Sequence, residues 1–338
     1  MSVSSQESAA QRATLQPVQL HVADNTVHEF ERFCFTYATG LQVSGTAALV
    51  ERNEVYNSGH FGASIRGNDL LFRYNVLHHL TMDTYDNSAL YFEPNDWTIW
   101  NMSVVNNFAY LNGGLATPCN FRTSCLRGAF YMDNQGAGLA VEGNVVYQPV
   151  PSGIPVDEWH NQPLFVAVNN DGGRNTRISN NIWVDTANGT YNSGGGIRWA
   201  AFGFMSNASA AYAEMRAVGW SSGLFEQRYP ALAELQDFYA PDCASNPLCP
   251  AAPFGNAVTR NVIVNLSGQV FLGPPPEVFA PGNFDVSNNL VNADPHFVAA
   301  DPRAELNFQL REDSPAYAPG MGFQRIPMEC FGPWSPCK

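Results

Sequence analysis

Two short segments of the sequence repeat one pattern and end on an acid. Residues 89–93 read ALYFE, and residues 129–133 read AFYMD. If the two segments stack in register, Glu93 and Asp133 become neighbours, with carboxyl groups about 5 Å apart. Carboxyl groups at that separation can act as general acid and as nucleophile or base. Asp86 lies just before the first segment and would reach the same face through a bend, about 6.5 to 9.5 Å from Asp133.

The strands that carry these acids also carry two equivalent tyrosines. Tyr91 and Tyr131 occupy the same position in the two segments, and we expect both to pack inside. The column of acids would continue to Asn170 in one direction and to Gly67 in the other. The small glycine would leave the floor of a groove.

Further side chains could bind a substrate beside these acids. His79 and Asp83 belong to the sequence HHLTMD, a few residues before the first segment. Asp171 and Arg174 belong to the loop sequence NNDGGRN. Trp97 offers an apolar ring face that suits the C–H face of a sugar. A structural histidine and a surface loop are the plainer interpretations of the first two sites.

The acids have structural and metal-binding interpretations as well. Acids at strand ends often cap turns through hydrogen bonds to the backbone. Stacked acids could also bind Ca²⁺ through oxygen ligands. The close cysteine spacing of a zinc site is absent, so we expect no cofactor other than Ca²⁺.

An asparagine repeat would position all of these residues. Seven segments each contain a polar residue, an asparagine and two or three alternating apolar residues. The shortest spacing, from Asn53 to Asn75, is 22 residues, which is enough for three short strands and their corners. The repeated asparagines are Asn53, Asn75, Asn107, Asn144, Asn181, Asn261 and Asn289.

This repeat predicts an all-β protein, a right-handed parallel β-helix. Successive coils would stack at about 4.8 Å, the ordinary strand spacing. An asparagine at one bend can form a ladder with its copies above and below, and it tolerates the left-handed backbone of a sharp corner. A β-sandwich with asparagine-rich turns is the alternative, but sandwich strands are longer and lack a fixed asparagine position.

We expect five regions along the chain. These are an N-terminal extension (1–24), β-helix coils (25–200), a helical insertion with a disulfide-stapled loop (201–255), final coils (256–320) and a C-terminal tail (321–338). The insertion contains ASAAYAEMRAV and YPALAELQDFY, which have helical spacing. The sequence after residue 304 would close the C-terminal end of the solenoid, where strand edges are otherwise exposed.

The cysteines indicate an oxidising compartment. Six of the seven form close pairs, Cys119 with Cys125, Cys243 with Cys249, and Cys330 with Cys337, each suited to a disulfide. Cys34 is left over, and we expect it buried and reduced. Four glycosylation sequons agree with secretion and start at Asn101, Asn188, Asn207 and Asn265.

The charge and the hydropathy of the chain limit the classes of partner that it can bind. The net charge is −13 and the only lysine is Lys338, so nucleic acid and acidic polysaccharides would be repelled. No apolar run is long enough to span a membrane. The first 16 residues lack an apolar signal core, so a signal has been removed or the chain is part of a longer protein.

Five stretches come in an order that resembles a known family: NSALYFEPNDWTIWNMSVVNNFAY, GAFYMDNQGAGLAVEGNVVY, NNDGGRNTRISNNIWVD, WSSGLFEQRYPAL and DPHFVAADPRAELNFQLREDSPAYAPGMGFQRIP. They resemble the C-terminal half of right-handed β-helix proteins of the pectate-lyase-like superfamily. The nearest branch surrounds glycoside hydrolase family 141, which holds fucosidase and xylanase activities. The resemblance covers roughly residues 41–325.

The resemblance implies that Asp86 and Asp133 are the catalytic pair. The family has a second acid after the one at Asp133, and this chain has Asn134 there. Where the family has GGRDN, this chain has GGRN, with Arg174 and Asn175. The family also has further coils upstream, so other chains could supply such coils here.

Three functions follow from these observations. The favoured one is a secreted glycoside hydrolase that acts on a neutral polysaccharide with paired carboxylates. The second is a non-catalytic extracellular solenoid that binds glycans or builds a larger assembly. The third is a polysaccharide lyase or epimerase on uronic acids, which the near-absence of lysine and the negative charge disfavour.

Overall fold

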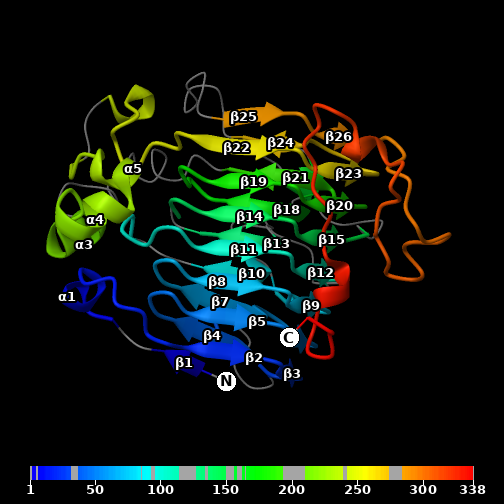
Figure 1. Ribbon diagram of the computed structural model, residues 1–338, viewed down its shortest axis with the longest axis horizontal. Helices are drawn as coiled ribbons and strands as arrows, with labels where there is room; N and C mark the ends of the chain where they lie inside the picture. Colours follow the sequence, from blue (N-terminus) through cyan, green and yellow to red (C-terminus); the bar gives the residue numbers. More distant parts are fainter. Residues whose placement is uncertain are drawn as a thin grey trace.

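The protein is a right-handed parallel β-helix, as the sequence predicts (Figure 1). The computed structural model describes residues 2–4, 7–31, 37–84, 86–92, 96–113, 127–133, 136–149, 156–157, 162–163, 165–192, 210–238, 242–273 and 284–337. Three sheets of eight strands run along the molecule, and every neighbouring pair within them is parallel.

Each coil contributes one strand to each sheet. Sheet A contains β1 (Ser2–Ser4), β4 (Leu41–Ser44), β7 (Ala63–Arg66), β10 (Asn87–Phe92), β13 (Arg127–Met132), β18 (Phe165–Asn170), β21 (Asn188–Tyr191) and β24 (Phe271–Leu272). Sheet B contains β2 (His21–Ala23), β5 (Leu49–Glu51), β8 (Leu71–Arg73), β11 (Ser103–Val105), β14 (Ala140–Glu142), β19 (Arg177–Ser179), β22 (Asn256–Thr259) and β25 (Phe284–Ser287). Sheet C contains β3 (Thr26–His28), β6 (Glu54–Tyr56), β9 (Val76–His78), β12 (Phe108–Tyr110), β15 (Val145–Tyr147), β20 (Ile182–Val184), β23 (Val262–Val264) and β26 (Leu290–Val291). A short antiparallel pair, β16 (Val156–Asp157) and β17 (Gln162–Pro163), lies between β15 and β18.

The core is a stack of apolar side chains from successive coils. In sheet B the middle residue of each three-residue strand points inward, because side chains alternate across a strand. Val50, Phe72 and Val104 are fully buried in this way and lie in register. The same core receives Leu90 and Phe92 from sheet A and Leu77 from sheet C. Apolar residues at this one position of each coil therefore hold the solenoid together.

The predicted asparagine ladder is present between sheets B and C. The side-chain amide of Asn75 donates to Asn107 Oδ1 at 3.0 Å, and each neighbouring pair repeats this contact. Asn25 extends the ladder by one rung, since its amide donates to Asn53 Oδ1 at 2.8 Å. Asn25 was not among the predicted asparagines of the repeat. The amides from Asn53 to Asn261 are fully buried, so each of these coils fixes the height of the next through hydrogen bonds that water does not replace.

The left-handed backbone lies one residue before each ladder asparagine, not at the asparagine itself. The residues there have φ between 52° and 65°: Asp24, Arg52, Tyr74, Asn106, Gly143, Asn180, Arg260 and Asn288. The ladder side chain can therefore keep one orientation in every coil, while the preceding residue makes the corner. Because left-handed backbone costs a residue other than glycine about 1 kcal/mol, the ladder must offset this strain.

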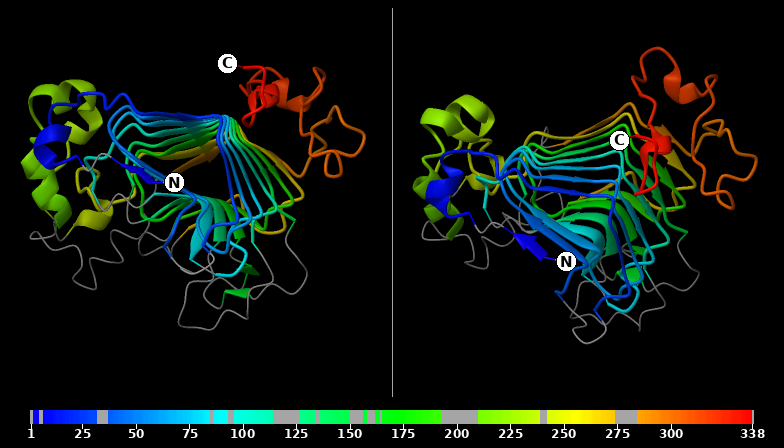
Figure 2. Two further views of the ribbon diagram at one scale, coloured as in Figure 1. Left: turned by 90° about the horizontal axis from the view of Figure 1, so that it is seen from below. Right: turned by 60° about the horizontal axis from the view of Figure 1, so that its bottom comes forward.

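A helical insertion lies beside the corner between sheets A and B (Figure 2). It contains α3 (Ala210–Val218), α4 (Gly223–Arg228) and α5 (Pro230–Ala233), and α1 (Ala9–Arg12) packs against α3. A 3-10 turn, Cys243–Ser245, follows, and a disulfide joins Cys243 to Cys249 as predicted. None of the helices in the described ranges is long and apolar enough to cross a membrane.

Two regional predictions need correction. Strands β1 and β2 lie within residues 1–24 and pair with β4 and β5, so the coils begin earlier than residue 25. The chain after β26 does not close the C-terminal end of the solenoid. It runs back along sheet C toward the N-terminal coils (Figure 1), where the Gly332 N–H donates to the Tyr74 carbonyl at 2.8 Å.

Apolar contacts outside the core fix this C-terminal segment. Phe308 is fully buried against Phe108 and Tyr147 on the outer face of sheet C. The segment contains the 3-10 turns Pro315–Tyr317 and Met328–Cys330, and the predicted disulfide between Cys330 and Cys337 is present. Cys34 and the pair Cys119 and Cys125 lie outside the described residues.

Candidate functional site

The two repeated segments stack in the predicted register. Tyr91 of β10 pairs with Tyr131 of β13, and Phe92 pairs with Met132. The Asp133 N–H donates to the Phe92 carbonyl at 3.0 Å, which continues the backbone pairing of β10 and β13 by one residue. Glu93, the acid of the first segment, lies outside the described residues.

The next coil places an acid, not an amide, in this column. Met132 pairs with Asn170 of β18, and the Asp171 N–H donates to the Met132 carbonyl at 2.8 Å. Asp171 therefore follows Asp133, and the expectation that Asn170 would do so was off by one residue. In the preceding coil the error is one residue in the other direction: Arg66 rather than Gly67 lies in the column, since Tyr91 pairs with Ser64.

The two tyrosines point outward, contrary to the prediction. Tyr91 and Tyr131 pack with Phe61 and Tyr191 in an apolar cluster on the outer face of sheet A. Every residue of β10 and β13 is buried, so the outward side chains are as inaccessible as the inward ones. Alternation of apolar and polar residues could therefore not tell the two faces apart.

Each tyrosine binds an acid of the neighbouring coil. Tyr91 donates its hydroxyl hydrogen to Asp133 Oδ2 at 2.8 Å. Tyr131 donates to Asp86 Oδ1 at 3.1 Å. Asp86 has a left-handed backbone, with φ of 55°, immediately before β10 begins. The turn that starts the strand therefore aims this carboxylate toward the tyrosine of the next coil.

Three carboxylates converge on the Tyr131 phenol. Tyr131 is only 5 % exposed. Burial, followed by the charges of Asp133, Asp171 and Asp86, raises its pKa well above the usual value. The phenol is therefore protonated at any physiological pH and acts as a hydrogen-bond donor. The sequence predicted Asp86, Asp133 and Asp171 for the site, and the structure brings all three to one side chain.

A groove of about 730 Å³ lies on the outer face of sheet A. Its lining includes Tyr91, whose hydroxyl donates to Asp133, but not Asp86, Asp133 or Asp171 themselves. Its floor carries Gln42, Ser44 and Ser64, the outward side chains of β4 and β7. One wall carries the rings of Tyr37 and Phe61, and Tyr91 lies where the groove approaches Asp133. The volume is within the usual range of sites for small ligands, and rings with nearby hydroxyl and amide groups suit a sugar.

The ionic groups of the groove balance one another. The lining contains two acids, Glu7 and Glu214, and two arginines, Arg12 and Arg66. Arg12 bridges Glu214 and the buried Asp96, each at 2.6 Å, and Arg66 lies 3.2 Å from Asp96. This network also fastens α1 and α3 beside the groove. The lining has no excess positive charge that would attract an acidic substrate.

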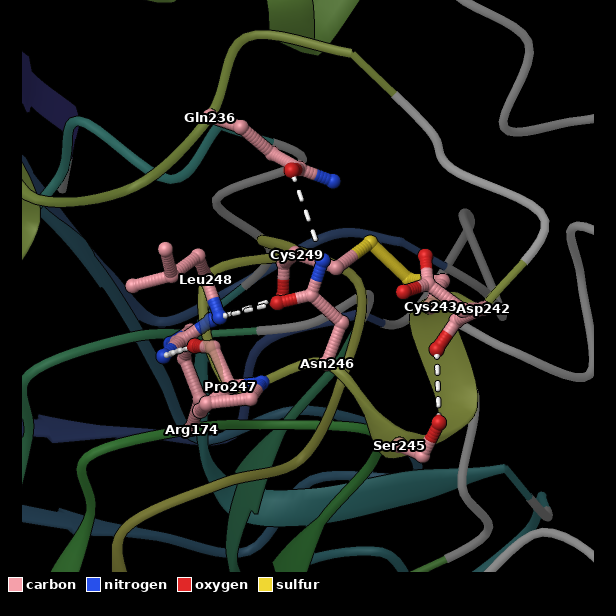
Figure 3. Close-up of a disulfide and its surroundings, with 9 residues drawn as sticks. All are labelled: Arg174, Gln236, Asp242, Cys243, Ser245, Asn246, Pro247, Leu248 and Cys249. Carbon is pink, nitrogen blue, oxygen red and sulfur yellow. Dashed lines mark hydrogen bonds between the residues drawn. A yellow bond between two sulfur atoms is a disulfide. The ribbon is translucent and has the colours of Figure 1, made fainter.

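Two predicted substrate-binding residues are structural instead. Trp97 is 1 % exposed and packs against Tyr212 of α3, so it cannot offer a ring face to a ligand. Arg174 is 4 % exposed and donates to the carbonyl oxygens of Cys249 at 2.7 Å and Pro247 at 2.8 Å (Figure 3). Arg174 therefore anchors the disulfide loop to the coils.

His79 and Asp83 do not join the acids. His79 Nδ1 lies 2.7 Å from His78 Nδ1, outside sheet C, where His78 stacks between Tyr56 and Tyr110. Asp83 is exposed and packs against Gly59, at which a Cβ atom would lie 2.7 Å from Asp83 Oδ2.

Glu31 is an unusual acid that was not among the predicted site residues. Its Oε2 accepts hydrogen bonds from the Ser58 hydroxyl and, at 2.7 Å, from the His60 N–H. Burial raises the pKa of Glu31 to about 7, and the charge of Asp83 acts in the same direction. His60 packs against Tyr37 and Phe61, which line the groove. No local motif marks Glu31, because its partners come from the next coil.

The predicted sequons differ in accessibility. Asn101 and Asn265 are exposed at corners between strands. Asn188 is fully buried and its Oδ1 accepts a hydrogen bond from the Gln269 N–H at 3.0 Å, so it cannot carry a glycan in this fold. Asn207 lies outside the described residues.

Metal ligands do not gather in the described part of the chain. No group of three or more histidine, cysteine, aspartate or glutamate side chains there could hold a metal ion.

Comparison with known proteins gave no match to a family model, to a curated protein or to a solved structure. The fold alone therefore defines the class of the protein, a parallel β-helix. The resemblance to glycoside hydrolase family 141 rests on the sequence motifs alone.

Proposed function

We propose that this protein is an extracellular glycoside hydrolase that cleaves a neutral polysaccharide on the outer face of sheet A. The observation that carries the proposal is that Tyr91, which lines a groove of about 730 Å³, donates a hydrogen bond to Asp133, while Tyr131 of the next coil donates one to Asp86. The disulfides Cys243–Cys249 and Cys330–Cys337 support an oxidising compartment.

Glycoside hydrolysis needs one carboxylic acid and one carboxylate. The acid protonates the departing oxygen, while the carboxylate attacks the sugar or activates water. Asp86 and Asp133 are assigned to this pair, because both have exposed surface and each accepts a hydrogen bond from a tyrosine. Asp171 is 7 % exposed, and its charge acts on the same phenol from within the protein.

The tyrosines would position the pair. A hydrogen bond from Tyr91 holds Asp133 Oδ2 in a fixed position. Tyr131 does the same for Asp86. Because the two tyrosines belong to stacked strands, the rigid sheet sets the separation of the two acids.

The groove favours a neutral substrate over a uronic acid polymer. Its lining contains as many acids as arginines, and the arginines are engaged by Glu214 and Asp96. The net charge of −13 also opposes a polyanion. A lyase or epimerase would need a cationic site for the uronate carboxylate, which this balanced lining does not supply.

The test is product analysis on neutral polysaccharides, including xylans and fucosylated glycans. We expect new reducing ends with the wild-type protein and at least a 100-fold lower rate for Asp133→Asn and for Asp86→Asn. The control is Asp285→Asn, an exposed acid on β25 away from the groove. Binding without cleavage by the wild-type protein would instead establish the non-catalytic glycan-binding solenoid.

A further inference from the structure

A second pocket lies away from sheet A, at the corner between sheets B and C. Its volume is about 410 Å³. One side is formed by the coils, through Glu142, Ser179 and Arg260, and the other by the C-terminal segment, through Gln324 and Arg325. It shares no lining residue with the sheet A groove.

The two arginines of this pocket lack the carboxylate partners that other arginines have. In the described ranges every other arginine pairs with an acid or, as Arg127 and Arg174 do, donates to backbone carbonyl oxygens. Arg260 reaches only the Ser179 hydroxyl, at 3.5 Å, and its buried Nε has no acceptor.

The acid in this pocket, Glu142, is bound by another arginine, Arg177. Arg177 binds both oxygens of Glu142, and the Ser179 hydroxyl donates to Oε1 at 2.6 Å. Although burial opposes ionisation, these hydrogen bonds hold the pKa of Glu142 below its usual value. Glu142 is therefore paired directly with Arg177, and the charge of Arg260 acts on it only from a greater distance, so that neither Arg260 nor Arg325 forms an ion pair in the part of the chain that the structure describes.

The C-terminal segment is held over the corner in a defined position. Asn180 Nδ2 donates to the Gln324 carbonyl at 3.1 Å, and the Gln324 N–H donates to Asn180 Oδ1 at 2.5 Å. Gly322 has φ of 67°, and a Cβ there would lie 3.1 Å from Arg260 Cδ. The segment thus passes close to the Arg260 stem and holds Arg325 at the other side of the pocket.

We propose that this pocket binds a tetrahedral oxyanion, sulfate or phosphate, between Arg260 and Arg325. Guanidinium groups bind such oxyanions through paired charge-assisted hydrogen bonds, and the orphaned Nε of Arg260 supplies one donor. Gln324 lies in the same lining. The anion would join the C-terminal segment to the coils, so its binding stabilises the fold.

The experiment measures thermal unfolding and calorimetric binding with sodium sulfate and with sodium phosphate, each compared with sodium chloride at equal ionic strength. We expect either oxyanion to raise Tm above the chloride value in the wild-type protein. Arg325→Gln, at an exposed position, should weaken binding at least tenfold, as should Arg260→Gln. Arg311→Gln, which removes an exposed arginine paired with Asp313, should bind as the wild type does.

Two results would overturn the proposal. One is an equal Tm response to sulfate, phosphate and chloride. The other is unchanged binding by Arg325→Gln, a variant whose exposed side chain makes misfolding no explanation. The oxyanion could be a free ion or an ester group on a sugar, and binding of sulfated and unsulfated forms of one oligosaccharide distinguishes these two sources. Tighter binding of the sulfated sugar than of free sulfate indicates an ester group as the ligand. Equal binding of the two indicates the free anion. Neither result depends on the sheet A groove.

Discussion

Tyr131 and Asp86 belong to adjacent coils, and the tyrosine hydroxyl donates to the aspartate across 3.1 Å. The reverse contact, from Tyr91 to Asp133, measures 2.8 Å. Each acid is therefore oriented by a side chain 42 to 45 residues away in the sequence, and both contacts depend on the register of β10 and β13. Register is thus the property that creates the site.

Tyr131→Phe tests this positioning role. The substitution keeps the ring and removes only the donor to Asp86. We expect a fall of about tenfold in kcat and a loss of about 1 kcal/mol in the free energy of unfolding. Steady-state kinetics and urea unfolding measure the two effects. Tyr317→Phe, outside the site, is the control, and an unchanged kcat in Tyr131→Phe would contradict the role.

The ladder should stabilise the solenoid most at its centre. Asn107→Ala removes the acceptor of the Asn75 N–H and the donor to the Phe72 carbonyl, both inside the protein. We expect a loss of about 3 kcal/mol, because these groups are left unsatisfied without access to water. Asn25→Ala, at the partly exposed end of the ladder, should cost about 1 kcal/mol. Equal costs for both variants in urea unfolding would argue against a cooperative ladder.

Arg174→Lys separates an anchoring role from substrate binding. A lysine cannot reproduce the fork that binds the Cys249 and Pro247 carbonyls. We expect a loss of about 2 kcal/mol in the free energy of unfolding and faster hydrogen exchange around residues 247–249. KM should remain unchanged once the protein is folded. A raised KM with unchanged stability would restore the original prediction that Arg174 contacts substrate.

The repeat made the fold predictable, whereas the predictions for Tyr91 and Trp97 failed because contacts from distant parts of the chain decide which side chains are buried. Asn53 and its equivalents mark a corner that recurs in the chain, so strand order and register follow from the sequence. Tyr91 lies in a strand that is buried on both faces, where periodicity carries no information about direction. Trp97 is covered by Tyr212, a residue of the insertion, and no local pattern in the sequence encodes that contact.

The candidate site was predicted in composition but not in detail. Asp86 and Asp133 were chosen from their places in the repeated segments, and the structure brings both to Tyr131. In the column of acids, Asn170 was predicted where the structure has Asp171. This error matters because a one-residue shift changes which face every side chain of a strand occupies. Glu31 escaped notice since its burial depends on Ser58 and His60 of another coil.

Glu31 should make stability depend on pH. Its pKa is raised to about 7 in the folded protein by burial, whereas an exposed glutamate titrates near 4.5. Between these values the folded state holds a proton that the unfolded state has lost, so this group stabilises the fold at low pH and the contribution is lost as pH rises toward 7. The nearby His60 acts oppositely, because burial lowers its pKa to about 4.

Comparison of Glu31→Gln with the wild type isolates the contribution of Glu31, because His60 is present in both. Glutamine resembles the protonated acid, so the two proteins should unfold alike at pH 4.5. At pH 8 the variant should be more stable by on the order of 2 kcal/mol, after allowance for the partial exposure of the carboxyl group. Urea unfolding at intervals between these pH values measures the difference. If the difference in the free energy of unfolding between the two proteins stays constant from pH 4.5 to pH 8, Glu31 ionises near its ordinary pKa and its burial does not destabilise the charged form.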